Sequence, residues 1–448
     1  MPADLSDVRL PGCTAEMALE RLWPPRSTIR WMKLPDHGSA DVGSVPGMWQ
    51  LRESAMWSGA DLVPEAPGPQ EHAIDAHVTT DVRATRATET TAPITQLPRY
   101  EQVAETEHEL DWADLVTLDL SKFDRDGGKQ ELASQLKEAV HNVGFFYVTN
   151  FGLSQESIDQ QFAIGKEIFQ MPTEEKLTYR ANLEQGDYSG YRPLGSIELF
   201  PGLRDNVEMY NVFKYIPELA RTQPKVVEEH STEIEGFQRH IAEDIVQKLL
   251  VLIAIVLELP EDHLTKGHKY KDKSECHLRY MIYHARTPEQ NEMYQNLYSR
   301  GHTDFGSLTL LFRQPIAALQ VLTADGDWKW VKPQPGSITV NIADVLQFWT
   351  AGYLKSSVHR VVAPPPDQCS LDRLGLLYFV RPAHDLDLKS LDSPLLERLG
   401  LKAEDAAARN IKAGDWVKAR VKGNLDKAVA GGHKEKAVLG GVKVKYYD

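Results

Sequence analysis

Two different spacings of apolar residues divide the chain near Lys273. Before that point, Lys129–Val143, Gln155–Lys176 and Glu233–Glu258 carry apolar side chains three and four residues apart, which predicts helices. After it, short apolar runs alternate with turn residues and predict strands. The expected strands are Leu278–Tyr283, Leu308–Phe312, Leu319–Leu322, Trp328–Val331, Ile338–Ile342, Val358–Val362 and Leu376–Val380. Many short strands at near-regular spacing indicate a sandwich or jelly roll rather than repeated strand–helix–strand units.

The same patterns divide the chain into four segments. Residues 1–105 are rich in proline and lack a sustained apolar period, so we expect a disordered extension or a processed leader there. An N-terminal α/β module is expected over 106–270, with order beginning near Asp111 and strands at Leu115–Leu120 and Phe145–Val148. Residues 271–390 form the strand-rich core, and 391–448 return to helical spacing as a C-terminal tail.

Composition and charge narrow the range of partners. The net charge of −14 argues against a nucleic-acid partner, because phosphate binding depends on clustered Lys and Arg. The longest apolar run, Leu249–Leu257, is far shorter than the ~20 residues of a bilayer span, so no membrane partner is expected. The three cysteines match neither a disulfide framework nor a zinc site. We expect a cytoplasmic protein that binds a small molecule.

Three residues form a candidate metal site. His302 and Asp304 lie two apart in Gly301–Gly306, and His359 follows 55 residues after the aspartate. In extended backbone, residues two apart project from the same face, so His302 and Asp304 can point together into a barrel mouth while His359 arrives from another strand. Two imidazoles and one carboxylate on one face of a metal leave three positions open, as in the facial triad of non-haem Fe(II) oxygenases.

Longer motifs surround these three residues. They are His302–Leu311, Val340–Asp344, Lys355–Val361 and Arg373 and, upstream, Val143–Leu153 and Phe169–Lys176. At these spacings residues 111–390 resemble the isopenicillin N synthase-like family of Fe(II)- and 2-oxoglutarate-dependent dioxygenases. The resemblance implies a mainly β fold with flanking α-helices, a distorted double-stranded β-helix of the jelly-roll, cupin-like kind, with iron in the barrel mouth.

The resemblance also implies an activity. The family oxidises small organic molecules, by hydroxylation, desaturation or another route, with Fe(II), dioxygen and 2-oxoglutarate, and releases succinate and CO2. A secondary metabolite is the expected substrate. By position, Arg373 would bind the distal carboxylate of 2-oxoglutarate, which suits a planar guanidinium. Tyr283 would offer its hydroxyl to the same carboxylate.

Two departures from the family motifs concern the co-substrate. Gly375 stands where an Arg-x-Ser motif has serine, and Met281 stands where an Asn-x-Tyr motif has asparagine. Each removes a polar contact. Two alternatives stay open beside the 2-oxoglutarate-dependent activity: an Fe(II) oxidase like isopenicillin N synthase, which uses no 2-oxoglutarate, and a non-catalytic ligand-binding barrel.

Three further residues are candidates for substrate contact. Phe379 and Arg381 follow Arg373 on alternate positions of one strand, and Arg279 lies four residues before Tyr283 on another. Two guanidinium groups and an aromatic ring would favour an acidic or phenolic substrate. Alternatively, Arg381 turns outward before Pro382 and pairs with an acid such as Asp385.

Overall fold

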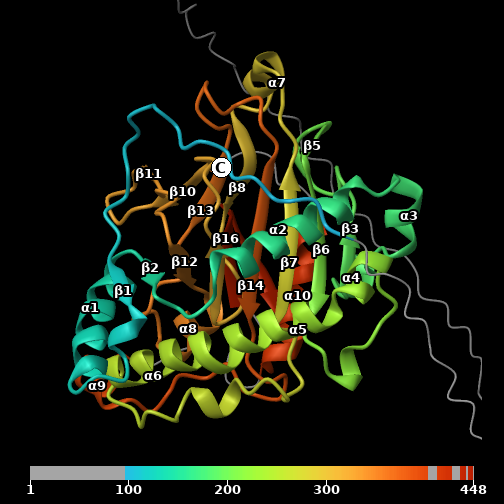
Figure 1. Ribbon diagram of the computed structural model, residues 1–448. Coiled ribbons are helices and arrows are strands. Elements are labelled where there is room, and N and C mark those ends of the chain that lie inside the picture. Colours follow the sequence, from blue (N-terminus) through green and yellow to red (C-terminus); the bar gives the residue numbers. More distant parts are fainter. Residues whose placement is uncertain (1–95, 402–410, 426–433, 440–441, 447–448) are drawn as a thin grey trace, which may run out of the picture. The chain divides into compact units, whose positions relative to one another are not determined.

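The computed structural model describes residues 96–401, 411–425, 434–439 and 442–446 (Figure 1). Two antiparallel sheets face each other and form the barrel. The larger has eight strands in the order β1-β2-β12-β9-β14-β7-β6-β3, in which only β1 and β2 run parallel. Their bounds are β1 Thr117–Asp119, β2 Phe145–Thr149, β3 Gly190–Arg192, β6 Val207–Phe213, β7 His277–Tyr283, β9 Leu308–Phe312, β12 Ser337–Ile342 and β14 Arg373–Val380.

The smaller sheet has the order β11-β10-β13-β8. Its strands are β8 Leu297–His302, β10 Leu319–Leu322, β11 Trp328–Trp330 and β13 His359–Val362. Buried side chains from the inner faces of both sheets pack together, such as Met281 of β7 and Val361 of β13. The expected double-stranded β-helix is therefore confirmed.

Helices cover the outer face of the larger sheet. In Figure 1, α2 (Gln155–Gln170), α5 (Ser231–His240) and α6 (Val246–Val256) cross its strands, and α1 (Gly128–Asn142) lies at the β1 end. Apolar residues of these helices and of the sheet form one core, in which Leu249 and Tyr378 are fully buried. The single helix predicted over Glu233–Glu258 is wrong in one respect, because a π-helical turn, Ile241–Ile245, joins α5 to α6.

Further helices and two hairpins complete the described structure, and all of these helices except α10 are short. The helices are α3 Thr173–Thr178, α4 Lys225–Glu229, α7 Pro288–Met293, α8 Asp344–Trp349, α9 Pro394–Arg398 and α10 Ala413–Leu425. One hairpin joins β4 (Glu198–Phe200) to β5 (Leu203–Arg204), and another joins β15 (Lys434–Leu439) to β16 (Val442–Tyr446). The expected helical tail therefore also contains a hairpin. No helix among the described residues is long and apolar enough to cross a bilayer.

The described chain is ordered before the expected start near Asp111. Most of the predicted extension, 1–95, lies outside the described residues, but 96–105 pack against the barrel. Tyr100 stacks on Phe162 of α2 at 4.7 Å, and Gln102 and Glu105 both contact the Arg313 guanidinium. The boundary predicted at residue 105 is therefore too late, because isolated contacts of this kind leave no apolar period in the sequence.

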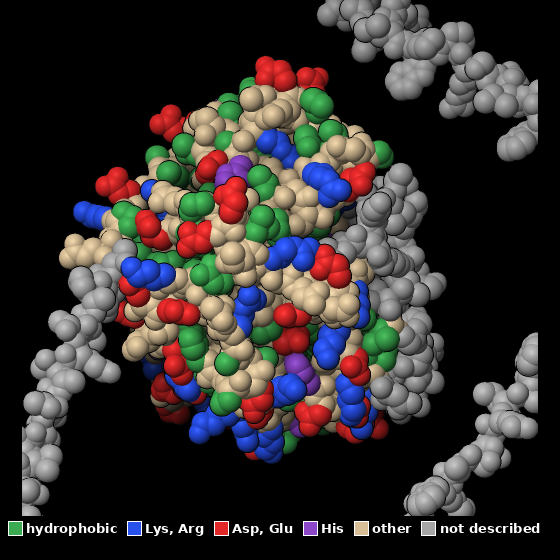
Figure 2. Space-filling view, turned by 90° about the vertical axis from the view of Figure 1, so that its right-hand side faces the viewer, with side chains coloured by type: hydrophobic (Ala, Val, Ile, Leu, Met, Phe, Trp, Pro, Cys, Tyr) green, Lys and Arg blue, Asp and Glu red, His purple; other side chains and the backbone are tan. Residues whose placement is uncertain are grey.

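The larger sheet also crosses the boundary expected at residue 270. Strands β1, β2, β3 and β6 come from the segment 106–270, and two of them pair with strands from 271–390, β2 with β12 and β6 with β7. The surface that Figure 2 shows carries side chains of both charges intermingled over its described part.

Candidate metal centre

The three candidate ligands meet where the two sheets approach each other. His302 and His359 are directly opposed partners on β8 and β13, and Asp304 follows β8 by two residues. One ligand atom from each of the three lies within 4.8 Å of the others. The imidazole centroids are 4.4 Å apart, and His359 Nε2 is 3.9 Å from Asp304 Oδ2. Strand pairing alone thus brings together two histidines that are 57 positions apart in the sequence.

The two imidazoles are oriented by backbone carbonyls. His302 Nδ1 lies 2.8 Å from the Arg300 carbonyl oxygen, and His359 Nδ1 lies 3.1 Å from that of Ser357. Each Nδ1–H can donate there, which leaves Nε2 as the ligand atom in both rings. Hydrogen bonds of this kind fix the tautomer and the direction of a metal-binding histidine.

The Asp304 carboxylate is held by two neighbours. Its Oδ2 accepts hydrogen bonds from Thr309 Oγ1 at 2.7 Å and Asn341 Nδ2 at 3.0 Å, and neither bond uses Oδ1. Burial alone would raise the pKa of Asp304, but the two imidazoles and these hydrogen bonds hold it well below its usual range. Burial and the neighbouring His359 lower the pKa of His302 to about 4. A neutral imidazole and a charged carboxylate suit a divalent cation, so the donor set fits Fe(II).

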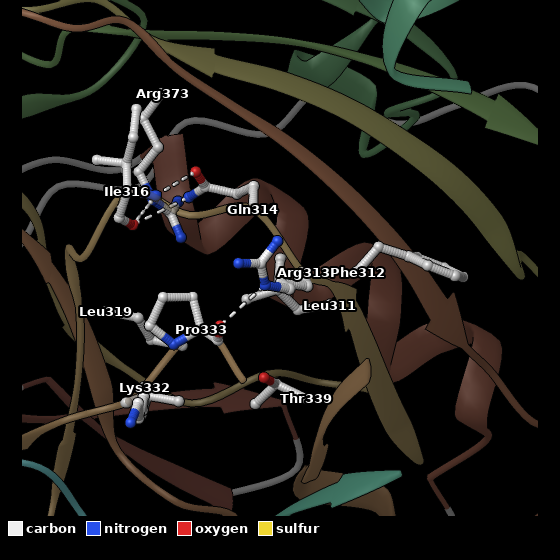
Figure 3. Close-up of a pocket in the computed structure, with 11 residues that line it drawn as sticks. Leu311, Phe312, Arg313, Gln314, Ile316, Leu319, Lys332, Pro333, Thr339 and Arg373 are labelled. Carbon is white, nitrogen blue, oxygen red and sulfur yellow. Dashed lines mark hydrogen bonds between the residues drawn. The ribbon is translucent and has the colours of Figure 1, made fainter. Parts of the chain in front are cut away.

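Arg373 and Tyr283 are directly opposed partners on β14 and β7, and both are buried. Arg373 lines a small pocket inside the barrel, together with Leu311, Leu319 and Thr339 (Figure 3). Its Nε donates to the Ile316 carbonyl oxygen at 3.4 Å. Burial lowers the pKa of Arg373 to about 10, so the guanidinium stays charged at neutral pH. The pocket thus presents a cation at one end of the barrel.

The three substrate candidates lie together on the inner face of the larger sheet. The Arg279 guanidinium lies over the Phe379 ring at 4.3 Å, and the Arg381 guanidinium lies 5.3 Å from the same ring. Phe379 pairs across the sheet with Thr309, which binds Asp304. Arg381 is 1% exposed, so the alternative that it turns outward toward Asp385 is wrong. It lies instead over the Phe305 ring at 4.6 Å.

Several residues of this region were not among the candidates. Thr309 and Asn341 orient Asp304, and His277 stacks on Phe379 at 4.8 Å. Arg420 of α10 reaches the Thr303 carbonyl oxygen from 117 residues away. Asn341 falls within the family-like motif Val340–Asp344, whereas no local pattern singles out Arg420.

Comparisons with known proteins cover the same regions of the chain. Residues 115–233 match the N-terminal domain described as a non-haem dioxygenase in morphine synthesis, and residues 275–382 match the 2OG-Fe(II) oxygenase superfamily. The UPF0676 protein C1494.01 of Schizosaccharomyces pombe is 32% identical over 65% of this chain and 87% of its own length. A 2-oxoglutarate-dependent dioxygenase of Didymella fabae is 28% identical over 59% of this chain and 83% of its own.

Solved structures share the fold. A full-length Neurospora crassa protein, in complex with 2-oxoglutarate and 5-formyluracil, superposes with a TM-score of 0.59 at 22% identity and covers 70% of this chain and 99% of its own. The structure of JOX2, in complex with 2-oxoglutarate, iron and JA, superposes with a TM-score of 0.52 at 22% identity. The match covers 73% of this chain and 94% of JOX2. The chain belongs to the isopenicillin N synthase-like family of Fe(II)- and 2-oxoglutarate-dependent oxygenases, and it is a dioxygenase that uses Fe(II), 2-oxoglutarate and dioxygen.

Proposed function

We propose that this dioxygenase oxidises a small acidic or phenolic metabolite at an iron held by His302, Asp304 and His359. The observation that carries the proposal is the convergence of one ring nitrogen from each histidine and one carboxylate oxygen within 4.8 Å. When bound, Fe(II) supplies the activation of dioxygen, coupled to the conversion of 2-oxoglutarate to succinate and CO2. The chain's own residues orient the ligands, hold the two organic molecules and exclude water.

Arg373 and Tyr283 are proposed to hold the distal carboxylate of 2-oxoglutarate. A buried guanidinium beside a tyrosine hydroxyl can bind a carboxylate through charge-assisted hydrogen bonds, which are stronger where water is excluded. Thr339 lines the same pocket. We propose that its hydroxyl offers a further polar contact to the bound co-substrate.

An aromatic group near Asp304 is proposed to hold the apolar body of the substrate. Phe379 and His277 stack with their ring planes 10° apart, and Phe213 and Tyr188 also pack against the imidazole, at centroid distances of 5.3 Å and 5.1 Å. Burial keeps the pKa of His277 well below its usual value, so the ring is neutral. Flat apolar surfaces of this kind suit a planar or compact hydrophobic substrate.

Arg279 and Arg381 are proposed to bind an acidic group on the substrate. Arg279 Nε donates to Asn211 Oδ1 at 2.7 Å, which directs the rest of the guanidinium over Phe379. In the described part of the chain, Nε and Nη1 of the buried Arg381 have no hydrogen-bond partner. Buried donors of this kind are normally satisfied, and a substrate anion would satisfy them. Glu275 is the competing acid, but burial raises its pKa to about 7.

A matched substrate panel tests this proposal. The protein is incubated with Fe(II), 2-oxoglutarate and dioxygen, and succinate is measured with each candidate acid and with its methyl ester. The proposal expects one or more acids to stimulate succinate release with matching product, and their esters to stimulate it much less. Equal stimulation by acid and ester would contradict an acidic substrate.

We also propose that the substrate is a secondary metabolite and that the protein is cytoplasmic. The free thiols of Cys276 and Cys369 agree with a reducing compartment.

A further inference from the structure

The C-terminal helix α10 contacts the loop that carries the proposed metal ligands. Arg420 on this helix donates from Nη2 to the Thr303 carbonyl oxygen at 3.0 Å, and Thr303 lies between His302 and Asp304. Its Nη1 donates to Asp344 Oδ2 at 2.6 Å. Both side chains of this ion pair are nearly fully buried, at 2% and 5% exposure. The contact therefore lies within the interior and not on the rim of the barrel.

Asp344 extends the contact to the metal ligand itself. Its backbone N–H donates to the Asp304 carbonyl oxygen at 2.9 Å, and its Oδ1 accepts from Ser356 Oγ at 2.8 Å. The next residue, Val345, donates to the Gly306 carbonyl oxygen at 2.8 Å. The Arg420 guanidinium thus links the Thr303 carbonyl to the Asp344 carboxylate. Asp344 is in turn bound through its backbone N–H to Asp304.

The same helix packs against two of the aromatic side chains proposed to hold the substrate, Tyr188 and Phe213. Val417 and Val421 pack with Tyr188 and Phe213, with Phe305 against the same cluster. The helix lies outside both regions that match the family models, the second of which ends at residue 382. Its role is therefore a property of this chain's C-terminal segment.

We propose that Arg420 is a positioning residue for the metal centre, through which α10 fixes the backbone between His302 and Asp304. The proposal rests on the proposed metal site. Loss of the guanidinium would release the Thr303 carbonyl and leave Asp344 without its ion-pair partner. The ligand loop could then move relative to His359. Loss of groups that orient metal ligands commonly weakens metal binding by about 10–100-fold.

The direction of the effect separates positioning from a purely electrostatic role. Removing a positive charge near the centre would, by Coulomb's law alone, strengthen the binding of a dication. Removing a positioning contact weakens it. A role limited to folding would lower the melting temperature but leave the affinity of the folded protein unchanged.

The test measures Mn(II) binding by calorimetry, without 2-oxoglutarate or turnover, on the full chain and three variants. Arg420→Met removes both contacts. Arg420→Lys keeps a cation beside Asp344 but cannot make both directed hydrogen bonds, and it carries the test if Arg420→Met does not fold. Lys412→Met is the matched control, because Lys412 directly precedes α10 and makes a half-exposed ion pair with Asp387 at 2.7 Å.

We expect Arg420→Met to bind Mn(II) at least about tenfold more weakly than wild type, Arg420→Lys to be intermediate, and Lys412→Met to match wild type. Unchanged or tighter binding in both Arg420 variants would overturn the proposal, as would an equal loss in Lys412→Met. If wild type binds no Mn(II), the proposed metal centre itself fails, and this inference fails with it.

Discussion

Gly375 lies directly opposite Met281 in the β14–β7 pair, and a Cβ atom added at position 375 would lie 3.0 Å from Met281 Cγ. These are the two positions at which the chain departs from the Arg-x-Ser and Asn-x-Tyr motifs. The methionine side chain occupies space that a serine at 375 would need. The two departures are therefore coupled by packing, since a larger residue at 375 would require the Met281 side chain to shift.

The first prediction is a packing coupling between these positions. Gly375→Ser should destabilise the protein by about 1 kcal/mol because it overpacks the barrel interior. In a Met281→Ala background the same substitution should cost at least about 0.5 kcal/mol less. Urea unfolding of the four proteins measures the coupling. Equal costs in both backgrounds would show that the methionine moves away freely.

The second prediction concerns the co-substrate. Arg373→Leu should raise the KM for 2-oxoglutarate by roughly thirtyfold or more, which corresponds to about 2–5 kcal/mol for truncating one side of a buried charge pair. Arg360→Leu is the control, because Arg360 stacks on Trp328 at 4.1 Å and alternates with His359, so it faces away from the barrel interior. An unchanged KM in Arg373→Leu would remove this arginine from the co-substrate site.

The third prediction separates substrate binding from co-substrate turnover. Arg381→Ala should raise the KM for the acidic substrate about tenfold or more, as expected for a lost charge-assisted hydrogen bond. Succinate formation in the absence of substrate should persist, because Arg373 and the three ligands are untouched. Steady-state kinetics with and without substrate give both values. If both activities fell equally, or neither changed, Arg381 would not contact the substrate.

The fourth prediction concerns stability at high pH. His284 lies between Asp372 and Glu208, and hydrogen bonds to these two carboxylates raise its pKa from 6.5 to about 9. A raised pKa means that the protonated form stabilises the fold fully below about pH 6.5 and that this contribution is lost as the pH rises through about 9. Because His284 is one-third exposed, we expect about 1–2 kcal/mol.

Urea unfolding of wild type and His284→Gln at several pH values measures this contribution. The stability difference between the two proteins should be largest near pH 6 and shrink by about pH 10. A difference that stays constant across this range would show that the imidazole acts through packing and not through its charge.

The sequence predicts those parts of the fold whose signal is local. Strands β9 and β10 have the bounds expected from their apolar runs, because turn residues flank both. Strand β8 was not predicted, since Leu297–His302 includes Ser299 and Arg300 and lacks an apolar run. The π-helical turn after α5 has no sequence signal, because an apolar stripe continues through it.

The site shows the same division between local and distant signals. Spacing and resemblance point to His302, Asp304 and His359, of which two paired strands bring the histidines together and the residues after β8 add the aspartate. Arg420 could not be found this way, because its contact with Thr303 depends on where α10 docks after a long separation in sequence. The packing of Met281 against Gly375 likewise requires the strand register, which neither motif contains.

We propose that His302, Asp304 and His359 together hold the iron to which 2-oxoglutarate binds. The decisive measurement is an anaerobic titration with Fe(II) and 2-oxoglutarate, followed by the weak visible charge-transfer band of the chelated co-substrate. Wild type should develop the band, whereas His302→Ala, Asp304→Ala and His359→Ala should remain folded by circular dichroism and develop none. A wild-type band in any one of the three folded variants, or no band in wild type, would contradict the account.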